Sequence, residues 1–257
     1  MTECNVAMVT GAARGIGRRT AHVLSADGYA LALVDMAFDG YREFDDDQEA
    51  DVRTELGRNG TTIWAEAATD DAAAMDSLVE EVLSKWGHLD ALVCNAGGGS
   101  GPLDGNRASE IDITDLTDVL RTNLIGTITT VTAALPALER SSNAAIVTMS
   151  SLNGIEPTDN GRYAHYGIAK AAVAHYTRYL SRDLREKGIR ANCIAPGPVT
   201  TGRLNHRMRE SPTANADLSQ AVGRFGTATE VAELVRYLVS ERSRYMNGQV
   251  IRLDGGA

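Results

Sequence analysis

A tyrosine and a lysine stand four residues apart in the segment "HYGIAKAAV", which runs from His165 to Val173. Residues i and i+4 of a helix share one face, so Lys170 would lie beside Tyr166. A free tyrosine has a pKa of about 10, which is too high for a general base at neutral pH, and a nearby cation lowers that value. The pair could therefore exchange a proton with an oxygen atom of a substrate.

Two more polar residues could complete such a centre. Ser151, in "VTMSSLNG", follows an apolar run that predicts a strand, and its hydroxyl could hold a substrate oxygen. Asn123, in "RTNLIGT", falls inside a predicted helix, where asparagine is mildly unfavourable. Tyr163 is a poorer candidate than Tyr166 because Gly167, and not a lysine, follows it by four residues.

The segment "TGAARGIG", Thr10–Gly17, lies between a predicted strand and a predicted helix. Its glycines permit backbone that a Cβ would block, and the N–H groups of the helix would face a pyrophosphate. Asp35 ends the second predicted strand, where it could accept hydrogen bonds from both ribose hydroxyls of an adenosine. It would repel a 2′-phosphate, which favours NAD over NADP, although Arg14 in the loop argues weakly for NADP.

The spacing Thr-Gly-x-x-x-Gly-x-Gly resembles the short-chain dehydrogenase/reductase family. Further segments of the chain repeat the resemblance, namely "NAG" at 95–97, "SSLNG" at 150–154, Tyr-x-x-x-Lys at 166–170 and "PG" at 196–197. The resemblance implies a catalytic set of Asn123, Ser151, Tyr166 and Lys170. In that set the asparagine distorts its helix and holds a water linked to the lysine, which also holds the cofactor ribose.

The glycine loop and the resemblance together predict one set of cofactor-binding residues. They are Gly11, Arg14, Gly15, Ile16, Gly17, Asp35, Asn95, Ala96, Gly97, Tyr166, Lys170, Pro196, Gly197, Val199 and Thr201. How the adenine is held stays open, because Ala68 stands where the family often has an acidic residue or asparagine. The nearby Asp70, backbone groups, or neither could hold its amino group.

Short β-rich runs alternate with helix-length segments along the whole chain. We expect strands at Val6–Thr10, Ala30–Asp35, Thr62–Glu66, Leu89–Asn95, Ala144–Ser150, Ile189–Ala195 and Gly248–Asp254, and helices near 15–27, 47–58, 71–86, 114–140, 162–186 and 228–240. This alternation predicts an α/β fold: a Rossmann-type, doubly wound parallel sheet of about seven strands with helices on both faces. We expect residues 1–257 to form a single domain, with a substrate lid near 199–224 and a solvated acidic loop at 36–51.

Composition restricts the function. The chain has 257 residues and a net charge of -9 with a pI of about 5.1, which disfavours nucleic-acid and anionic-membrane partners. Three scattered cysteines form neither a disulfide framework nor a metal motif, and the histidines lack ligand spacing, so we predict no metal. With no apolar segment long enough to span a bilayer and no signal peptide, we expect a cytoplasmic protein.

The leading hypothesis is an NAD(H)-dependent oxidoreductase that interconverts a secondary alcohol and its ketone, with Tyr166 as general acid and base. Its small-molecule substrate would be a polyol, sugar, hydroxy acid or dihydrodiol. We expect the substrate-binding groups to come from polar segments that contain Arg107, Arg162, Arg203 and His206. The alternatives are an NADP-dependent 3-oxoacyl-thioester reductase and a non-catalytic dinucleotide-binding regulator. The resemblance also implies a homotetramer or homodimer.

Overall fold

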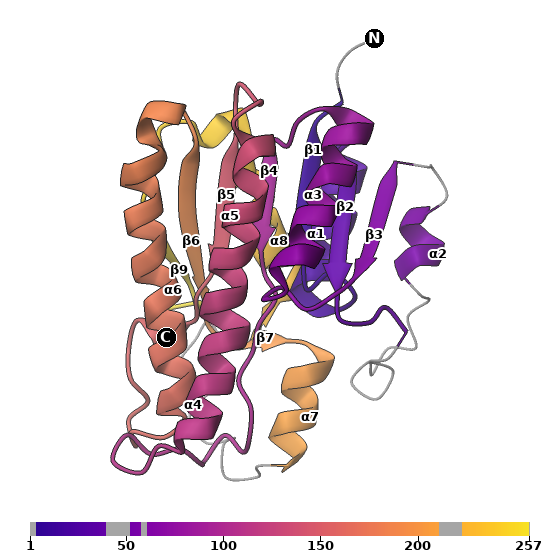
Figure 1. The fold of residues 1–257 in the computed structure, drawn as a ribbon. Coiled ribbons are helices and arrows are strands. Elements are labelled where there is room, and N and C mark those ends of the chain that lie inside the picture. Colours follow the sequence, from indigo (N-terminus) through magenta and orange to yellow (C-terminus); the bar gives the residue numbers. More distant parts are fainter. Residues whose placement is uncertain (1–3, 40–51, 58–60, 211–222, 257) are drawn as a thin grey trace.

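The computed structural model describes residues 4–39, 52–57, 61–210 and 223–256. In this part of the chain seven parallel strands form one sheet, in the order β3-β2-β1-β4-β5-β6-β9 (Figure 1). Their bounds are β1 Val6–Thr10, β2 Ala30–Asp35, β3 Thr62–Glu66, β4 Ala91–Cys94, β5 Ala145–Met149, β6 Arg190–Pro196 and β9 Val250–Leu253. The predicted sheet is therefore confirmed, and β4 is shorter than the expected run from Leu89 to Asn95.

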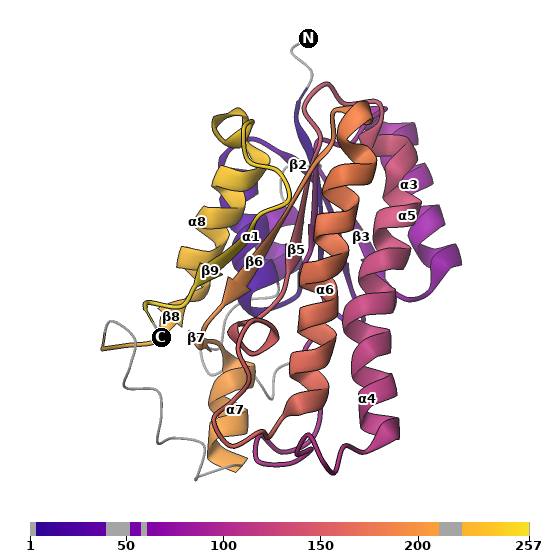
Figure 2. The ribbon, with the colours of Figure 1, turned by 90° about the vertical axis from the view of Figure 1, so that its left-hand side faces the viewer.

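Helices cover both faces of the sheet, as Figure 2 shows edge-on. They are α1 Gly15–Ala26, α2 Val52–Leu56, α3 Ala72–Trp86, α4 Ile113–Leu120, α5 Gly126–Leu138, α6 Ala164–Asp183, α7 Gly202–Glu210 and α8 Ala228–Val239. One apolar core lies between the sheet and α3, α5 and α6, and the other lies between the sheet and α1, α2 and α8. Strands such as β1 and β5 are buried throughout because both of their faces are covered.

The long helix expected at 114–140 is interrupted. Between α4 and α5, residues Arg121–Ile125 form a π-helical turn, in which the N–H of Gly126 donates to the carbonyl of Arg121. Such a turn inserts one extra residue into the helix and is frequent at functional sites. Asn123 lies at its centre, in agreement with the distortion that the family resemblance implied.

The segment expected to form a lid contains a short strand and a helix that the sequence did not predict. Val199–Thr200 (β7) pairs in parallel with Gly226–Thr227 (β8), and α7 follows β7 beyond the carboxyl ends of the main strands (Figure 1). The sequence showed little periodicity here, so this helix was missed. Residues 211–222 of the lid segment lie outside the described residues, as do 40–51 of the acidic loop and the start of the helix expected at 47–58.

In the described ranges of the chain, no helix is both long enough and apolar enough to cross a lipid bilayer.

Candidate active site

A cleft of about 940 Å³ runs along the carboxyl ends of the strands. Open α/β sheets bind ligands at this edge, where the strand order reverses between β1 and β4. The predicted residues that line it are Gly11, Arg14, Gly15, Ile16, Asp35, Asn95, Ala96, Gly97, Ser151, Tyr166, Lys170, Pro196, Gly197, Val199 and Thr201. Gly17 and Asn123 lie directly behind this lining and support it.

The glycine loop leaves no room for side chains at two positions. A Cβ on Gly17 would lie 2.0 Å from the carbonyl oxygen of Gly11, and a Cβ on Gly11 would lie 2.9 Å from the Cα of Ala96. Gly11 and Gly15 also have φ values of +65° and +54°, which side chains rarely adopt. The loop therefore folds tightly against the end of β4 and exposes its backbone to the cleft.

Thr10 and Asn95 fasten that loop to β4. The hydroxyl of Thr10 accepts hydrogen bonds from the backbone N–H groups of Asn95 and Ala96, at 3.0 and 2.9 Å. The side-chain amide of Asn95 donates to the carbonyls of Thr10 and Gly11, at 3.0 and 3.1 Å. Asn95 thus has a mainly structural task here, and Thr10, which the glycine motif contains, was not singled out from the sequence.

The carboxylate of Asp35 is fixed at the end of β2. One oxygen accepts from the N–H of Ala13 in the glycine loop at 2.9 Å, and the other accepts from the N–H of Met36 at 2.8 Å. The carboxylate lines the cleft at the end of β2, where an adenosine ribose binds in folds of this type. The tight loop, its exposed N–H groups and this oriented carboxylate together fit a dinucleotide.

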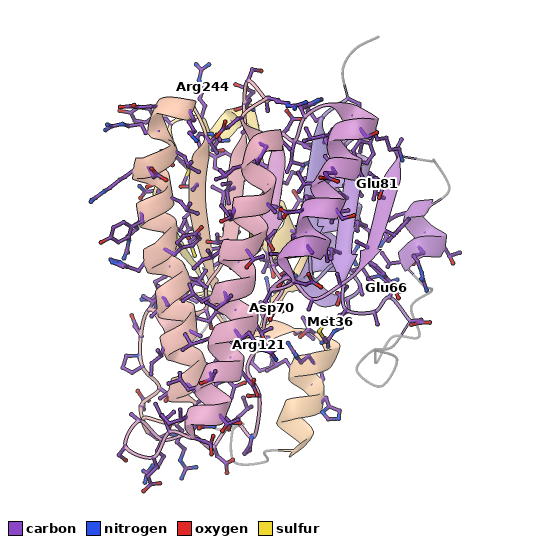
Figure 3. The ribbon with its side chains drawn as sticks, viewed as in Figure 1. Met36, Glu66, Asp70, Glu81, Arg121 and Arg244 are labelled. Atoms are coloured by element: carbon purple, nitrogen blue, oxygen red, sulfur yellow. The ribbon has the colours of Figure 1, made fainter. Side chains whose placement is uncertain are left out.

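Asp70, Arg121 and Met36 meet at the same end of the cleft, as the labelled side chains of Figure 3 show. A guanidinium nitrogen of Arg121 lies 3.6 Å from a carboxylate oxygen of Asp70. Ala68 also lines this end and brings no polar side chain. Of the options left open for the adenine, Asp70 and the backbone therefore lie in the right part of the cleft.

Three consecutive glycines after β4 each leave space for a different side chain. A Cβ on Gly97 would lie 2.4 Å from Oδ1 of Asn123, and one on Gly99 would lie 2.0 Å from the hydroxyl of Tyr163. A Cβ on Gly98 would lie 1.9 Å from a guanidinium nitrogen of Arg203. The run "GGG" is therefore the surface on which three distant segments of the chain meet.

Asn123 is buried and holds this glycine run in place. Its Oδ1 accepts from the N–H of Gly98 at 3.0 Å, and its Nδ2 donates to the carbonyls of Gly98 and Val119, both at 2.8 Å. Its own backbone carbonyl accepts from the hydroxyl of Thr127 at 2.7 Å. The π-helical turn aims this side chain at the cleft wall.

Tyr166 lies near the start of α6 and forms a side-chain hydrogen bond with Ser151. Burial raises the pKa of its hydroxyl above the ordinary value, because phenolate loses hydration. The hydrogen bond from Ser151 and the positive charge of Arg203 both oppose that rise. Ser151 caps the N-terminus of a short 3₁₀ turn, Leu152–Gly154. It is the second serine of the "SS" pair, and its hydroxyl is the one that contacts Tyr166.

Lys170 is buried, and its ammonium donates to the carbonyl of Met149 at 2.9 Å. Its Nζ lies 5.8 Å from the centre of the Tyr166 ring, on the same helix face as predicted. Burial lowers the pKa of Lys170 to about 8. The role predicted for Lys170, lowering the pKa of Tyr166, stays a prediction, and the positive charge of Arg203 acts on that pKa in the same direction.

The other serine and the "PG" segment secure the far wall. The hydroxyl of Ser150 donates to the carbonyl of Lys170 at 2.7 Å, which is the structural task expected for it. A Cβ on Gly197 would lie 2.9 Å from the Cα of Asp254, and the methyl group of Thr201 lies 3.4 Å from the position of a Cβ on Gly15. The end of β6 therefore packs against Asp254, and Thr201, just before α7, packs against the glycine loop.

Sequence reasoning missed several lining residues at the substrate end. Tyr163, set aside as a catalytic residue, lies at φ +58° before α6, and its ring centre is 5.2 Å from that of Tyr166. Apolar side chains join it, contributed by Leu103, Leu152, Leu204 and Phe225. Of the four basic candidates, Arg162 and Arg203 line the cleft, whereas Arg107 and His206 do not. No sequence signal marks these loops, because their side chains meet only in the fold.

A family model described as enoyl-(acyl carrier protein) reductase matches residues 11–257. Cyclohexanol dehydrogenase of Rhodococcus sp. strain TK6 is 40% identical over 259 residues, covering 98% of this chain and 95% of the relative. The chain belongs to the short-chain dehydrogenase/reductase family. It is an oxidoreductase of the nicotinamide-dependent alcohol dehydrogenase and ketone reductase type.

Other members of the family resemble the chain over almost its full length. The 3-oxoacyl-[acyl-carrier-protein] reductase of Staphylococcus aureus strain Mu50 is 32% identical, covering 97% of this chain and 96% of the relative. The solved structure of levodione reductase superposes with a TM-score of 0.85 at 27% identity, covering 98% of this chain and 96% of the other. The fold and the reaction type are thus shared across relatives that act on different substrates.

Proposed function

We propose that the enzyme interconverts a cyclic secondary alcohol and its ketone with NAD(H), and that Asn123, Ser151, Tyr166 and Lys170 carry the proton chemistry. The observation that supports this most is the meeting of Tyr166, Ser151 and Lys170 in one cleft with an oriented Asp35. The 40% identity to a cyclohexanol dehydrogenase supports the ring-shaped substrate. Apolar side chains such as Leu152 and Leu204 suit a ring of carbon atoms.

A nicotinamide, when bound, supplies the hydride chemistry. The glycine loop would hold the pyrophosphate, Asp35 the adenosine ribose, and Lys170 and Tyr166 the ribose beside the reacting carbon. Ser151 would hold the substrate oxygen with its hydroxyl, and Tyr166 would take the hydroxyl proton during oxidation and return it during reduction. Asn123 would keep Gly98 and the adjoining backbone in place, and would hold the relay water that the family resemblance implies.

The decisive experiment removes the hydroxyl group of either of two tyrosines in the cleft, Tyr166 or Tyr163. Tyr166→Phe should lower the turnover of cyclohexanol, followed as NADH absorbance, by about 1000-fold, because general acid–base catalysis contributes on that scale. Its affinity for NADH, measured by fluorescence titration, should stay close to that of the unmodified enzyme. Tyr163→Phe, the matched control, should lose far less activity. If the two variants lose the same activity, Tyr166 has no special role.

The choice of NAD rests on Asp35. Its carboxylate lies where an adenosine ribose would bind, and it would repel the two negative charges of a 2′-phosphate. Titration should therefore show tighter binding of NADH than of NADPH, and Asp35→Asn should narrow the difference. Equal affinities in the unmodified enzyme would contradict this interpretation of Asp35.

One other function has direct support. The relatives at 32% identity are 3-oxoacyl-[acyl-carrier-protein] reductases, so reduction of a 3-oxoacyl thioester is the second candidate. It predicts faster oxidation of NADPH with acetoacetyl thioesters than reduction of NAD with cyclohexanol. A comparison of these two assays decides between the candidates. A cytoplasmic location and a dimeric or tetrameric assembly remain part of the proposal.

A further inference from the structure

The arginines that line the cleft differ in their partners. Arg121 pairs with Asp70 at 3.6 Å, Arg162 with Asp104 at 3.9 Å, and Arg224 with Glu230 at 2.7 Å. Arg203 makes no ion pair with any acidic residue in the described ranges, and its guanidinium donates to the backbone carbonyl of Gly97 at 2.8 Å. A carbonyl accepts one of its five N–H bonds but carries no net negative charge to balance the guanidinium.

Arg203 lies next to the reaction centre. Its guanidinium lies against Gly98, so close that a Cβ there would be 1.9 Å from Nη1. Its charge acts on both Tyr166 and Lys170, lowering the pKa of each. Lys170 and Arg203 therefore bring two positive charges close to Tyr166, and among the described residues no carboxylate contributes to the pKa shifts of Tyr166 and Lys170.

One part of the wall at this end of the cleft is apolar, and polar and charged side chains such as Asp104, Glu156 and Arg162 line the rest. Leu152, Leu204, Phe225 and the ring of Tyr163 line the apolar part, together with the glycine run. Such walls favour a carbon skeleton, and one cationic group among them would fix its orientation. A guanidinium forms charge-assisted, forked hydrogen bonds with a carboxylate, which would also balance the two cations.

We propose that Arg203 binds a carboxylate carried by the substrate, and hence that the preferred substrate is a secondary alcohol or ketone on an apolar ring bearing one carboxylate. The inference rests on the proposed function and adds the charge of the substrate. It also assigns Arg203, on the first turn of α7, as the residue that selects that charge.

The experiment compares 4-hydroxycyclohexanecarboxylate with cyclohexanol as substrates. The unmodified enzyme should have the higher kcat/KM for the acid, and Arg203→Met should lower the ratio of the two kcat/KM values by about 100-fold, as loss of a desolvated charge partner does. Arg107→Met is the matched control, since Arg107 is exposed and does not line the cleft, and it should leave the ratio unchanged.

Two results would overturn the inference. One is an unchanged ratio in Arg203→Met. The other is an equal loss on both substrates together with a shifted pH–rate profile, since Arg203 would then act only on the pKa of Tyr166. A calorimetric titration with cyclohexanecarboxylate in the presence of NAD tests the same contact without turnover, and Arg203→Met should abolish the binding seen in the unmodified enzyme and in Arg107→Met.

The calorimetric titration also distinguishes failure of the proposed function from failure of the inference about Arg203. If neither alcohol yields NADH but the carboxylate binds in an Arg203-dependent way, the proposed function fails and the inference about Arg203 holds. If cyclohexanol is oxidised and the carboxylate does not bind, the proposed function holds and the inference fails.

Discussion

The two ends of the cleft are built in different ways. At the cofactor end, the glycine loop, Thr10 and Asn95 form a tight set of backbone contacts in which a single Cβ on Gly17 would meet a carbonyl oxygen at 2.0 Å. At the substrate end, side chains from α6, α7 and the loops meet over the glycine run at Gly97–Gly99. A Cβ added to one of these three glycines would displace the end of a side chain and not the backbone.

This difference explains how one fold serves several substrates. A surface made of fixed backbone permits few changes, whereas a surface made of side-chain ends adjusts when one residue changes. The chain resembles both a cyclohexanol dehydrogenase and a 3-oxoacyl reductase over nearly its whole length. Substitutions at the two ends should therefore differ in both the size and the kind of their effect.

The largest effect is expected at the cofactor end. Gly17→Ala should weaken NADH binding by about 100-fold, because the loop must shift by roughly an ångström to free the carbonyl oxygen of Gly11. Fluorescence titration measures the loss. Gly57→Ala is the control, because apart from its chain neighbours no atom of the described residues lies within 4 Å of a Cβ there, and it should bind NADH normally. Normal NADH binding by Gly17→Ala would show that this end also adapts.

A smaller and different effect is expected at the substrate end. Gly99→Ala places a Cβ 2.0 Å from the hydroxyl of Tyr163, whose ring packs against Tyr166 and His165 and must tilt. The kcat/KM for the alcohol should fall by about 10-fold from this displacement. Affinity for NADH, measured on the same protein, should not change. A matching loss of cofactor affinity would mean that the two ends are coupled.

The smallest effect concerns Lys170, which lies where the two ends meet. Its pKa is lowered to about 8 in the folded chain from 10.5, so above pH 8 the unfolded state binds more protons and stability rises with pH. Below pH 8 the folded state carries the full cost of the buried charge. Lys170→Met has no ammonium group to lose its proton, so its stability does not rise in this way with pH. The free energy of unfolding of the variant, relative to that of the unmodified enzyme, should therefore fall by about 1 kcal/mol between pH 7 and 8.5.

Denaturant unfolding of the cofactor-free protein at the two pH values measures that difference. A constant difference between Lys170→Met and the unmodified enzyme would mean that Lys170 keeps its ordinary pKa in the fold. Arg203→Met offers an independent check, because removing that cation should raise the pKa of Lys170.

The fold was predicted closely because its signals are local. Apolar runs such as "ALALVD" predict buried parallel strands, and the strand-helix alternation predicts the sheet, whose seven strands are confirmed. The departures lie where local patterns are weak. The π-helical turn at Asn123 is an ordinary helical pattern in the sequence, and α7 has too few apolar residues to be recognised.

The candidate site was predicted unevenly for the same reason. Gly11, Gly17 and Asp35 have tasks set by the backbone beside them, so their spacing along the chain reveals them. Tyr163 and Arg203 have tasks set by Gly98 and Gly99, which belong to a different strand loop. Such contacts leave no periodic trace in the sequence.

The sequence by itself determined the parallel sheet, the glycine loop, the acidic end of β2 and the tyrosine-lysine pair on one helix face. Each of these depends on residues a few positions apart, whose relative placement follows from strand or helix geometry. Only the tertiary structure decided that the charge of Arg203 also lowers the pKa of Tyr166, and that Tyr163 forms a cleft wall. Those relations join segments brought together by the packing of α6 and α7 against the carboxyl edge of the sheet.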